Sequence, residues 1–265
     1  VWAVGGAVRD ALLGTPHVAW DLAPSARPHE VRRLFRRTVP IGIEHGTVGV
    51  FAAADGIMYE VTTFRRDVET FGRHAVVEFS DNIVEDLARR DFTINALAWD
   101  PLTNELLDPY NGIGDLRDAV LRTVGHAESR FAEDWLRILR ALRFAGHYVL
   151  SFEPATWKAL TTSVDNLTSL SAERIREELY KILGKTAHAS AALRLYESSG
   201  ALRVLYPELH ATVGVAPPDG AGDVWMRTLI AVDAIPVTRM QLRMAALLHG
   251  VGMPCGADLG VGRGR

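Results

Sequence analysis

Two adjacent glycines near the start of the chain have the spacing of a phosphate-binding turn. Gly5 and Gly6 follow a short apolar strand predicted at 1–4 and precede a short helix predicted at 7–13. Glycine lets the backbone approach a ligand closely, and the unpaired N–H groups at the start of a helix attract phosphate. Arg9, in the first turn, brings a guanidinium to the same phosphates. The alternative is a plain structural turn, the usual role of such a pair.

An acidic residue follows on the next predicted strand, 17–23. Alternate residues on a strand share a face, so Asp21 lies with Ala19 and Ala23 on the side opposite Trp20. One carboxylate near a phosphate holds one Mg²⁺ weakly, whereas two-metal phosphoryl transfer needs carboxylates at neighbouring positions of one face. Asp21 is therefore either a metal ligand or an ordinary solvated strand residue.

A second acid lies in a predicted hairpin. The β-rich runs 47–53 and 57–64 flank Ala54-Asp55-Gly56, a typical hairpin turn. Glu60, on the second arm, is a candidate further catalytic acid from a neighbouring strand. The alternative is a charge that keeps an edge strand from pairing with another chain.

The segment 85–96 (EDLARRDFTINA) combines paired acids, paired arginines and an asparagine. Such charge density is usually a solvated helix face. Here Phe92, Ile94 and Ala96 alternate with polar residues, which predicts partial burial. Buried arginines need anionic partners, so this segment is a second candidate site.

Residues 131–145 are predicted to form one amphipathic helix. At 100° per residue, Asp134, Arg137 and Arg140 lie at about 0°, 300° and 240°, with Arg143 at the margin of this polar face. The opposite side is apolar and consists of Phe131, Trp135, Ile138, Leu139 and Leu142. The polar face offers an acceptor and fixed donors suited to the Watson–Crick edge of a base. The alternative is an ion pair on a solvated helix.

The remaining pattern places these residues on an α/β head followed by helices. A helix is predicted at 28–37, and helical periodicity takes over from about residue 128. Ser171 caps a later helix that Gly184 ends. The Pro- and Gly-rich stretch 215–223 is the best internal linker.

Composition narrows the class of protein. The chain has 265 residues, 48% hydrophobic and 23% charged, as expected for a globular protein of about two domains. No apolar run approaches the ~20 residues of a membrane helix, and no signal segment stands at the start. The single cysteine, Cys255, excludes an internal disulfide framework and a cysteine zinc site. Val1 in place of a methionine and the final VGRGR predict that the chain is cut from a longer one.

Charge is nearly balanced, at −3, so any basic surface for nucleic acid must be local. All but three of the 29 basic residues are arginines. This bias fits either a GC-rich genome or the recognition of phosphates and base edges by planar guanidinium groups.

Six strings, in this order, resemble class II tRNA nucleotidyltransferases and poly(A) polymerases, and most closely the bacterial CCA-adding enzymes. They are VGGAVRDALLG (4–14), WDLA (20–23), EDLARRDFTINALA (85–98), DPYNGIGDLRD (108–118), EDWLRILRALRFA (133–145) and SAERIREEL (171–179). Together they cover most of residues 1–185.

The resemblance implies an α+β fold with three parts. Residues 1–125 form a polymerase-β-like nucleotidyltransferase head, a mixed sheet with helices. Residues 126–185 form a helical neck that recognises the nucleotide base, and 186–265 a truncated helical body. The activity implied is transfer of CMP and AMP from CTP and ATP to the 3′ acceptor end of tRNA. It takes place in the cytoplasm, with Mg²⁺ as cofactor and no membrane.

The resemblance also implies roles for single residues. Asp21 would bind the metal and, with Glu60 as the candidate second acid, serve catalysis. Asp134 and Arg137 would read the base, supported by Arg140 and Arg143. The full set of implied nucleotide-binding residues is Gly5, Gly6, Arg9, Arg90, Asp134, Arg137, Arg140 and Arg143.

The chain departs from the family at the metal strand. Ala19 stands where the family has the first acid of an acid-x-acid pair, and Pro24 where it usually has threonine. Without that carboxylate, the metal that activates the 3′-hydroxyl loses its anchor, and neither Asp21 nor Glu60 replaces it by spacing. We therefore expect strongly reduced catalysis with nucleotide binding retained.

A weaker resemblance, to HD phosphohydrolase domains, covers 223–229 and 246–254. That family carries histidine near Arg227 and a His-Asp pair where this chain has His249-Gly250. A metal site needs several ligands, so the region is predicted to be structural.

Two alternatives to CCA addition stay open. The same motifs serve poly(A) polymerases. Ala19 and the degraded His-Asp pair favour a tRNA- or nucleotide-binding protein that has lost catalysis.

Overall fold

The computed structural model describes residues 1–15, 20–51, 56–71, 74–217 and 222–254. The chain divides into two compact units, Val1–Asp134 and Trp135–Arg265. The first combines a sheet with short helices, and the second is built mainly of helices. The fold class is therefore α+β, which confirms the prediction.

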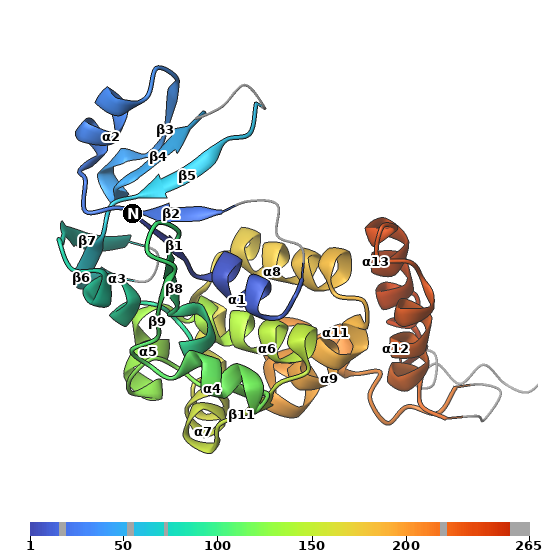
Figure 1. Ribbon diagram of the computed structural model, residues 1–265. Helices are drawn as coiled ribbons and strands as arrows, with labels where there is room; N and C mark the ends of the chain where they lie inside the picture. Colours follow the sequence, from blue (N-terminus) through green and yellow to red (C-terminus); the bar gives the residue numbers. More distant parts are fainter. Residues whose placement is uncertain (16–19, 52–55, 72–73, 218–221, 255–265) are drawn as a thin grey trace, which may run out of the picture. The chain divides into compact units, whose positions relative to one another are not determined.

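A mixed sheet forms the centre of the first unit (Figure 1). Among the described residues its seven strands run in the order β3-β4-β5-β2-β1-β8-β9. Strands β2 and β5 pair in parallel, and the other neighbours are antiparallel. The sheet strands are β1 (Trp2–Val4), β2 (Asp21–Ala23), β3 (Thr38–Gly42), β4 (Thr47–Val50), β5 (Tyr59–Thr62), β8 (Ala98–Asp100) and β9 (Glu105–Leu107). Outside this sheet lie the paired strands β6 (Arg65–Phe71) and β7 (His74–Phe79), and the short β10 (Val120–Leu121).

Apolar side chains hold helices against this sheet. Val31 of α2 packs on Val48 and Val50 of β4, and Val8 of α1 belongs to a cluster with Leu97. The burial of each such side chain stabilises the folded state by about 1.5–3 kcal/mol. The helical elements of this unit are α1 (Gly6–Leu12), α2 (Pro28–Leu34), η1 (Ile43–His45), α3 (Ile83–Ala88), η2 (Thr93–Asn95), α4 (Gly112–Arg117) and α5 (Ala127–Glu133).

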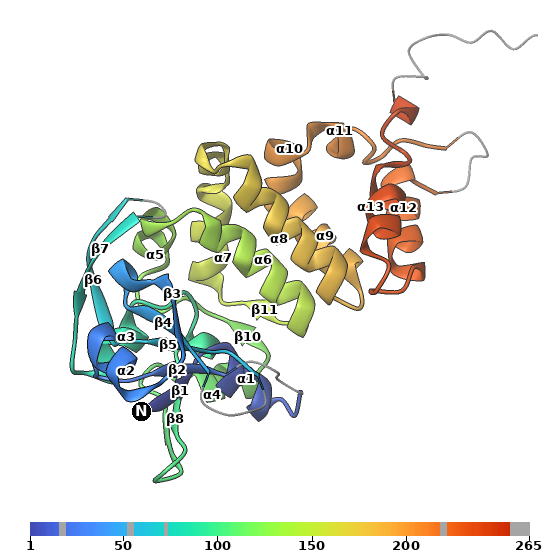
Figure 2. The same ribbon diagram turned by 90° about the horizontal axis from the view of Figure 1, so that it is seen from above.

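The helices α6, α8 and α9 lie side by side in the second unit (Figure 2). A Cβ at Gly146 of α6 would lie 2.5 Å from the Cα of Ala192 on α9. Glycine therefore permits the close approach of these two helices. The elements are α6 (Leu136–Tyr148), β11 (Ser151–Phe152), α7 (Pro154–Thr162), η3 (Val164–Ser169), α8 (Ala172–Lys185), α9 (Ala189–Ser199), α10 (Ala201–Leu205), α11 (Pro207–His210), α12 (Val224–Ala234) and α13 (Met240–Leu248).

The predicted continuous helix at 131–145 is wrong. The structure ends α5 at Glu133 and begins α6 at Leu136, with Asp134 in an extended conformation (φ −158°, ψ 108°). Arg130 fixes α5 to the rest of the first unit, because its guanidinium donates to the backbone carbonyl oxygens of Ala88 and Val124 at 2.9 and 3.0 Å. The apolar spacing continues across the break, so periodicity alone does not reveal it.

The predicted hairpin is confirmed, since β4 and β5 pair antiparallel; residues 52–55 of its turn lie outside the described residues. The edge-strand interpretation of Glu60 is wrong, because β5 lies between β4 and β2. Two helix ends also differ from the prediction. Helix α2 ends at Leu34 rather than near residue 37, and α8 runs through Gly184 to Lys185.

Candidate functional site

The Gly5 turn lies against the guanidinium of Arg90. Gly5 adopts φ 70° and ψ −130°, a backbone region that side chains disfavour, and its N–H donates to the carbonyl of Leu97 at 3.0 Å. A Cβ at Gly5 would lie 2.4 Å from Nη1 of Arg90. Two features therefore require glycine at position 5: the backbone conformation, and the guanidinium of Arg90, which leaves no room for a Cβ.

Arg9 lies buried beneath the same turn, with 5% of its surface exposed. Its Nε donates to Oδ1 of Asp10 at 2.9 Å, and its Nη1 donates to Oδ1 of Asn95. Gly6 is close by, since a Cβ there would lie 3.3 Å from Nη2 of Arg9. The structure thus brings Gly5, Gly6 and Arg9 together, with Arg9 bonded to neighbouring side chains.

Asn95 joins Arg9 to Arg90. Its side chain accepts from Arg9 and donates from Nδ2 to Oδ1 of Asp91 at 2.9 Å. The backbone carbonyl oxygen of Asn95 accepts from Nη1 of Arg90 at 3.4 Å. Sequence reasoning assigned Asn95 no role, although it lies in the segment 85–96 that was singled out for its charges.

Asp86 is buried between two arginines. Its Oδ1 accepts from Nε and Nη2 of Arg89 at 3.0 and 2.9 Å, and its Oδ2 accepts from Nη2 of Arg90 at 3.0 Å. Burial by itself would raise the pKa of the Asp86 carboxyl. The charges and hydrogen bonds of Arg89 and Arg90 outweigh burial and hold that pKa below its usual range. Asp86 is therefore a charged, fully engaged carboxylate.

Asp21 and Glu60 lie side by side in the sheet. They are paired residues of the parallel strands β2 and β5, so both side chains project from the same face. Both are exposed. This pair of carboxylates can hold one divalent cation, but among the described residues no group of three or more metal-binding side chains forms. Ala19 lies outside the described residues.

The predicted base-reading residues do not share one helix. Asp134 follows the end of α5, whereas Arg137, Arg140 and Arg143 lie on α6. The guanidinium carbons of Arg140 and Arg143 lie 5.3 and 4.2 Å from the ring centre of Phe144 on the same helix.

Arg143 also forms an ion pair with a buried acid of α8. Its Nε donates to Oε2 of Glu178 at 2.6 Å, and Nζ of Lys181 donates to Oε1 of the same side chain at 2.8 Å. Burial would raise the pKa of the Glu178 carboxyl, but Arg143 and Lys181 hold it below its usual range. Glu178 thus fixes the orientation of Arg143.

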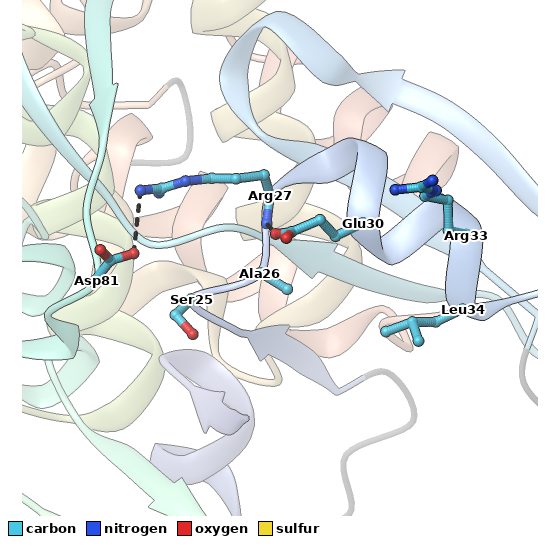
Figure 3. Close-up of a pocket in the computed structure, with 7 residues that line it drawn as sticks. All are labelled: Ser25, Ala26, Arg27, Glu30, Arg33, Leu34 and Asp81. Atoms are coloured by element: carbon cyan, nitrogen blue, oxygen red, sulfur yellow. Dashed lines mark hydrogen bonds and ion pairs between the residues drawn. The ribbon is translucent and has the colours of Figure 1, made fainter.

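A hollow of about 730 Å³ opens beside α2, away from the predicted site residues (Figure 3). It is lined by Ser25, Ala26, Arg27, Glu30, Arg33, Leu34 and Asp81. Arg27 donates from Nη2 to Asp81 Oδ1 at 3.1 Å, and its backbone N–H donates to Glu30 Oε2 at 2.7 Å. Because these polar groups bond to one another, we assign the hollow no ligand.

The structure describes His249, in the HD-like region, and Arg243, just before it. Nδ1 of His249 lies 2.6 Å from the carbonyl oxygen of Ala246 in the preceding turn. Arg243, which sequence reasoning missed, is 2% exposed. Its guanidinium donates to four backbone carbonyl oxygens, those of Leu183, Thr186, Ala187 and Ile235, at 2.7–3.1 Å. Arg243 therefore ties α13 to the C-terminal end of α8.

Two family models match the chain. One, described as the poly A polymerase head domain, matches residues 1–122, and the other, a probable RNA and SrmB-binding site of polymerase A, matches 150–212. A CCA-adding enzyme of Lactobacillus johnsonii is 38% identical over 251 residues, which cover 88% of this chain and 61% of that protein. The chain belongs to the CCA-adding enzyme and poly(A) polymerase family.

Further members of this family agree with the assignment. A CCA-adding enzyme of Streptococcus thermophilus is 48% identical over 182 residues, which cover 68% of this chain and 44% of that protein. The crystal structure of the Bacillus stearothermophilus CCA-adding enzyme in complex with CTP matches with a TM-score of 0.71 and 36% identity. That match covers 97% of this chain and 64% of the other. The chain therefore spans less than two thirds of the length of these relatives.

The helices of the described part of the chain include none that is both long and apolar enough to cross a membrane.

Proposed function

We propose that the protein adds nucleotides to the 3′ end of tRNA without a template, taking CMP from CTP and AMP from ATP. The observation that carries this proposal is the network of Gly5, Arg9, Asn95 and Arg90, in a segment that matches the poly A polymerase head domain. Relatives named CCA-adding enzymes, one of them solved with CTP, support the choice of reaction and nucleotide. This function places the protein in the cytoplasm, where bacterial tRNA is processed.

The Gly5 turn and Arg90 are the parts of the head suited to the nucleotide. The turn offers backbone that no Cβ shields, and Arg90 offers a guanidinium that Asp86 holds beside this turn and that is suited to a phosphate. Arg9, which is bonded to Asn95 and Asp10, and Gly6 beside its guanidinium complete the proposed nucleotide-binding set of the head. In the proposed reaction the 3′-hydroxyl oxygen of tRNA attacks the α-phosphorus of the nucleotide, and pyrophosphate leaves.

Mg²⁺ is the proposed cofactor, with Asp21 as its ligand and Glu60 beside it. Two exposed carboxylates at paired positions of neighbouring strands suit an oxygen-seeking cation. When bound, the cation would offset the negative charge of the triphosphate. The first acid of the family's acid-x-acid pair is absent at Ala19, so the chain offers a weak site for one ion. We therefore expect slow catalysis with nucleotide binding retained.

The bases are proposed to be read by Asp134 and Arg137, with Arg140 and Arg143 in support. Asp134 offers acceptors, and the arginines of α6 offer donors in fixed forks. Glu178 and Phe144 limit the freedom of Arg143. We propose a division into a head (1–125), a neck (126–185) and a body (186–265).

Product length tests the proposed function. The protein is incubated with CTP, ATP and Mg²⁺ and a tRNA that lacks its last three nucleotides. A product that stops after three additions supports CCA addition, whereas continued addition of AMP identifies a poly(A) polymerase, the alternative that the head-domain match also favours.

A binding protein without catalysis is the second alternative, favoured by Ala19. Calorimetry with CTP and with ATP separates it from the enzyme. Binding of either nucleotide with no incorporation at any protein concentration supports this alternative and contradicts the proposed function.

A further inference from the structure

Among the described residues, Asp86 forms the shorter of the two hydrogen bonds to the guanidinium of Arg90. The distance from Nη2 of Arg90 to Oδ2 of Asp86 is 3.0 Å, whereas Nη1 lies 3.4 Å from the carbonyl oxygen of Asn95. The Nε–H of Arg90 is buried and has no hydrogen-bond partner among the described residues. The position of this guanidinium therefore depends chiefly on one carboxylate oxygen.

The carboxylate of Asp86 is itself held in place. It is 1% exposed, and its other oxygen accepts two hydrogen bonds from Arg89. Charge-assisted bonds of this kind are about twice as strong as neutral ones. The two hydrogen bonds from Arg89 thus fix the Asp86 carboxylate, and this carboxylate in turn fixes Arg90.

The contact with Gly5 shows where this arrangement directs Arg90. Nη1 occupies the space where a Cβ of Gly5 would stand, 2.4 Å from that position. A shift of the guanidinium toward Gly5 meets the backbone of the turn, and the bond from Nη2 to Asp86 limits other shifts. Arg90 is therefore held between the turn and the carboxylate.

We propose that Asp86 is a positioning residue, which holds Arg90 against the Gly5 turn so that Arg90 binds the incoming nucleoside triphosphate. This inference rests on the proposed function, in which Arg90 contacts the nucleotide. Asp86 does not touch the substrate itself. Replacing its carboxylate by an amide removes the charge and leaves one acceptor oxygen where Arg89 and Arg90 together need two.

The experiment measures CTP affinity by calorimetry, because binding does not depend on the residue at position 19. We expect Asp86→Asn to weaken CTP binding about tenfold, the loss typical of one charged hydrogen bond. Asp86→Glu keeps the charge and is expected to stay within about threefold of the parent.

Arg89→Gln is the matched control. It breaks the ion pair on the other oxygen of the same carboxylate and leaves the bond to Arg90 in place. It is expected to lower the melting temperature as Asp86→Asn does, but to weaken CTP binding only about threefold, because the bond from Arg90 to Asp86 remains while the carboxylate loses the bonds that fix it.

A double-mutant cycle distinguishes positioning from a general loss of structure. If Asp86 acts through Arg90, Asp86→Asn weakens CTP binding by less than about twofold in an Arg90→Gln background. An undiminished tenfold loss in that background overturns the inference. Should Asp86→Asn not fold, Arg89→Gln takes its place in the cycle, and its roughly threefold loss of CTP affinity must likewise vanish in the Arg90→Gln background.

The two proposals fail in different ways. If the parent binds CTP and Asp86→Asn binds it equally well, the positioning role is overturned and the proposed function stands. If the parent binds neither CTP nor ATP, the proposed function is overturned, and this inference with it.

Discussion

Asp21 on β2 lies directly beside Glu60 on β5, at paired positions of two parallel strands. Because their side chains share one face of the sheet, the two carboxylates form the best candidate metal site in the described part of the first unit. The sequence does not predict this pairing, because no local residue pattern indicates that β5 pairs in parallel with β2.

The first prediction concerns this pair. Asp21→Asn is expected to weaken Mn²⁺ binding in the presence of CTP about tenfold, because it removes a charged oxygen ligand. Glu60→Gln is expected to weaken it about threefold, since Glu60 is the second ligand rather than the first. Electron paramagnetic resonance of free Mn²⁺ measures both values.

Glu44→Gln controls for the loss of one negative charge, because Glu44 is an exposed acid on η1. Unchanged Mn²⁺ affinity in Asp21→Asn would exclude Asp21 as a metal ligand.

The second prediction concerns the Gly5 turn. Gly5→Ala is expected to destabilise the protein by about 1–3 kcal/mol, because the backbone there suits only glycine. It is also expected to weaken CTP binding about tenfold, because the added Cβ displaces Nη1 of Arg90.

Gly14→Ala is the matched variant for this test. Gly14 also has a positive φ, of 67°, but a Cβ there meets nothing within 4 Å. It is expected to cost about 1 kcal/mol of stability without a change in CTP affinity. Equal CTP affinity in Gly5→Ala and Gly14→Ala would contradict the placement of Arg90.

The third prediction concerns Arg243 and the second unit. Arg243→Met is expected to lower the free energy of unfolding by about 3 kcal/mol or more, because it leaves buried carbonyl oxygens without donors. Arg239→Met, at an exposed position just before α13, is expected to cost less than about 0.5 kcal/mol. Urea unfolding compares the two, and equal losses would show that the buried bonds of Arg243 do not stabilise the fold.

The fourth prediction concerns the stability of the fold at low pH. Arg89 and Arg90 lower the pKa of Asp86, and Arg143 and Lys181 lower that of Glu178. A carboxyl whose pKa is lower in the folded state stabilises the fold fully above its unfolded pKa, at about 4. That contribution is lost as pH falls through the lowered pKa.

Glu178→Gln and Asp86→Asn should therefore each lower stability near pH 7 and make it less dependent on pH below about 4. Thermal melts from pH 7 to pH 2 measure this. Parallel pH profiles for the parent and both variants would show that these ion pairs do not stabilise the folded protein.

Much of the fold follows from local signals in the sequence. The Gly5-Gly6 turn, the hairpin that carries Glu60 and the start of α8 directly after Ser171 all lie where the sequence predicts them, although the Ser171 side chain makes no capping bond to the helix backbone. Each depends on neighbours along the chain. The break at Asp134 does not, because the apolar spacing runs through it while Arg130 anchors the preceding helix to distant carbonyl groups.

The candidate site shows the same division. The charges of the segment 85–96 identify it as a candidate site, but they do not show which residues are its hydrogen-bond partners. Arg9 bonds to Asn95, 86 positions along the chain, and Arg243 bonds to three carbonyl groups more than fifty positions away. Such long-range bonds depend on how the elements pack, and composition or periodicity carries no signal for them.

We propose that this chain holds a nucleotidyltransferase site weakened at one carboxylate. The most direct test compares the parent with Ala19→Asp in the addition of CMP and AMP to a tRNA lacking its last three nucleotides, with Mg²⁺ present. We predict similar CTP affinity in both proteins. Restoring the acid should raise the rate of addition by about a hundredfold or more, as expected when a metal ligand is regained. Equal rates in the two proteins, or no addition by Ala19→Asp, would contradict the account.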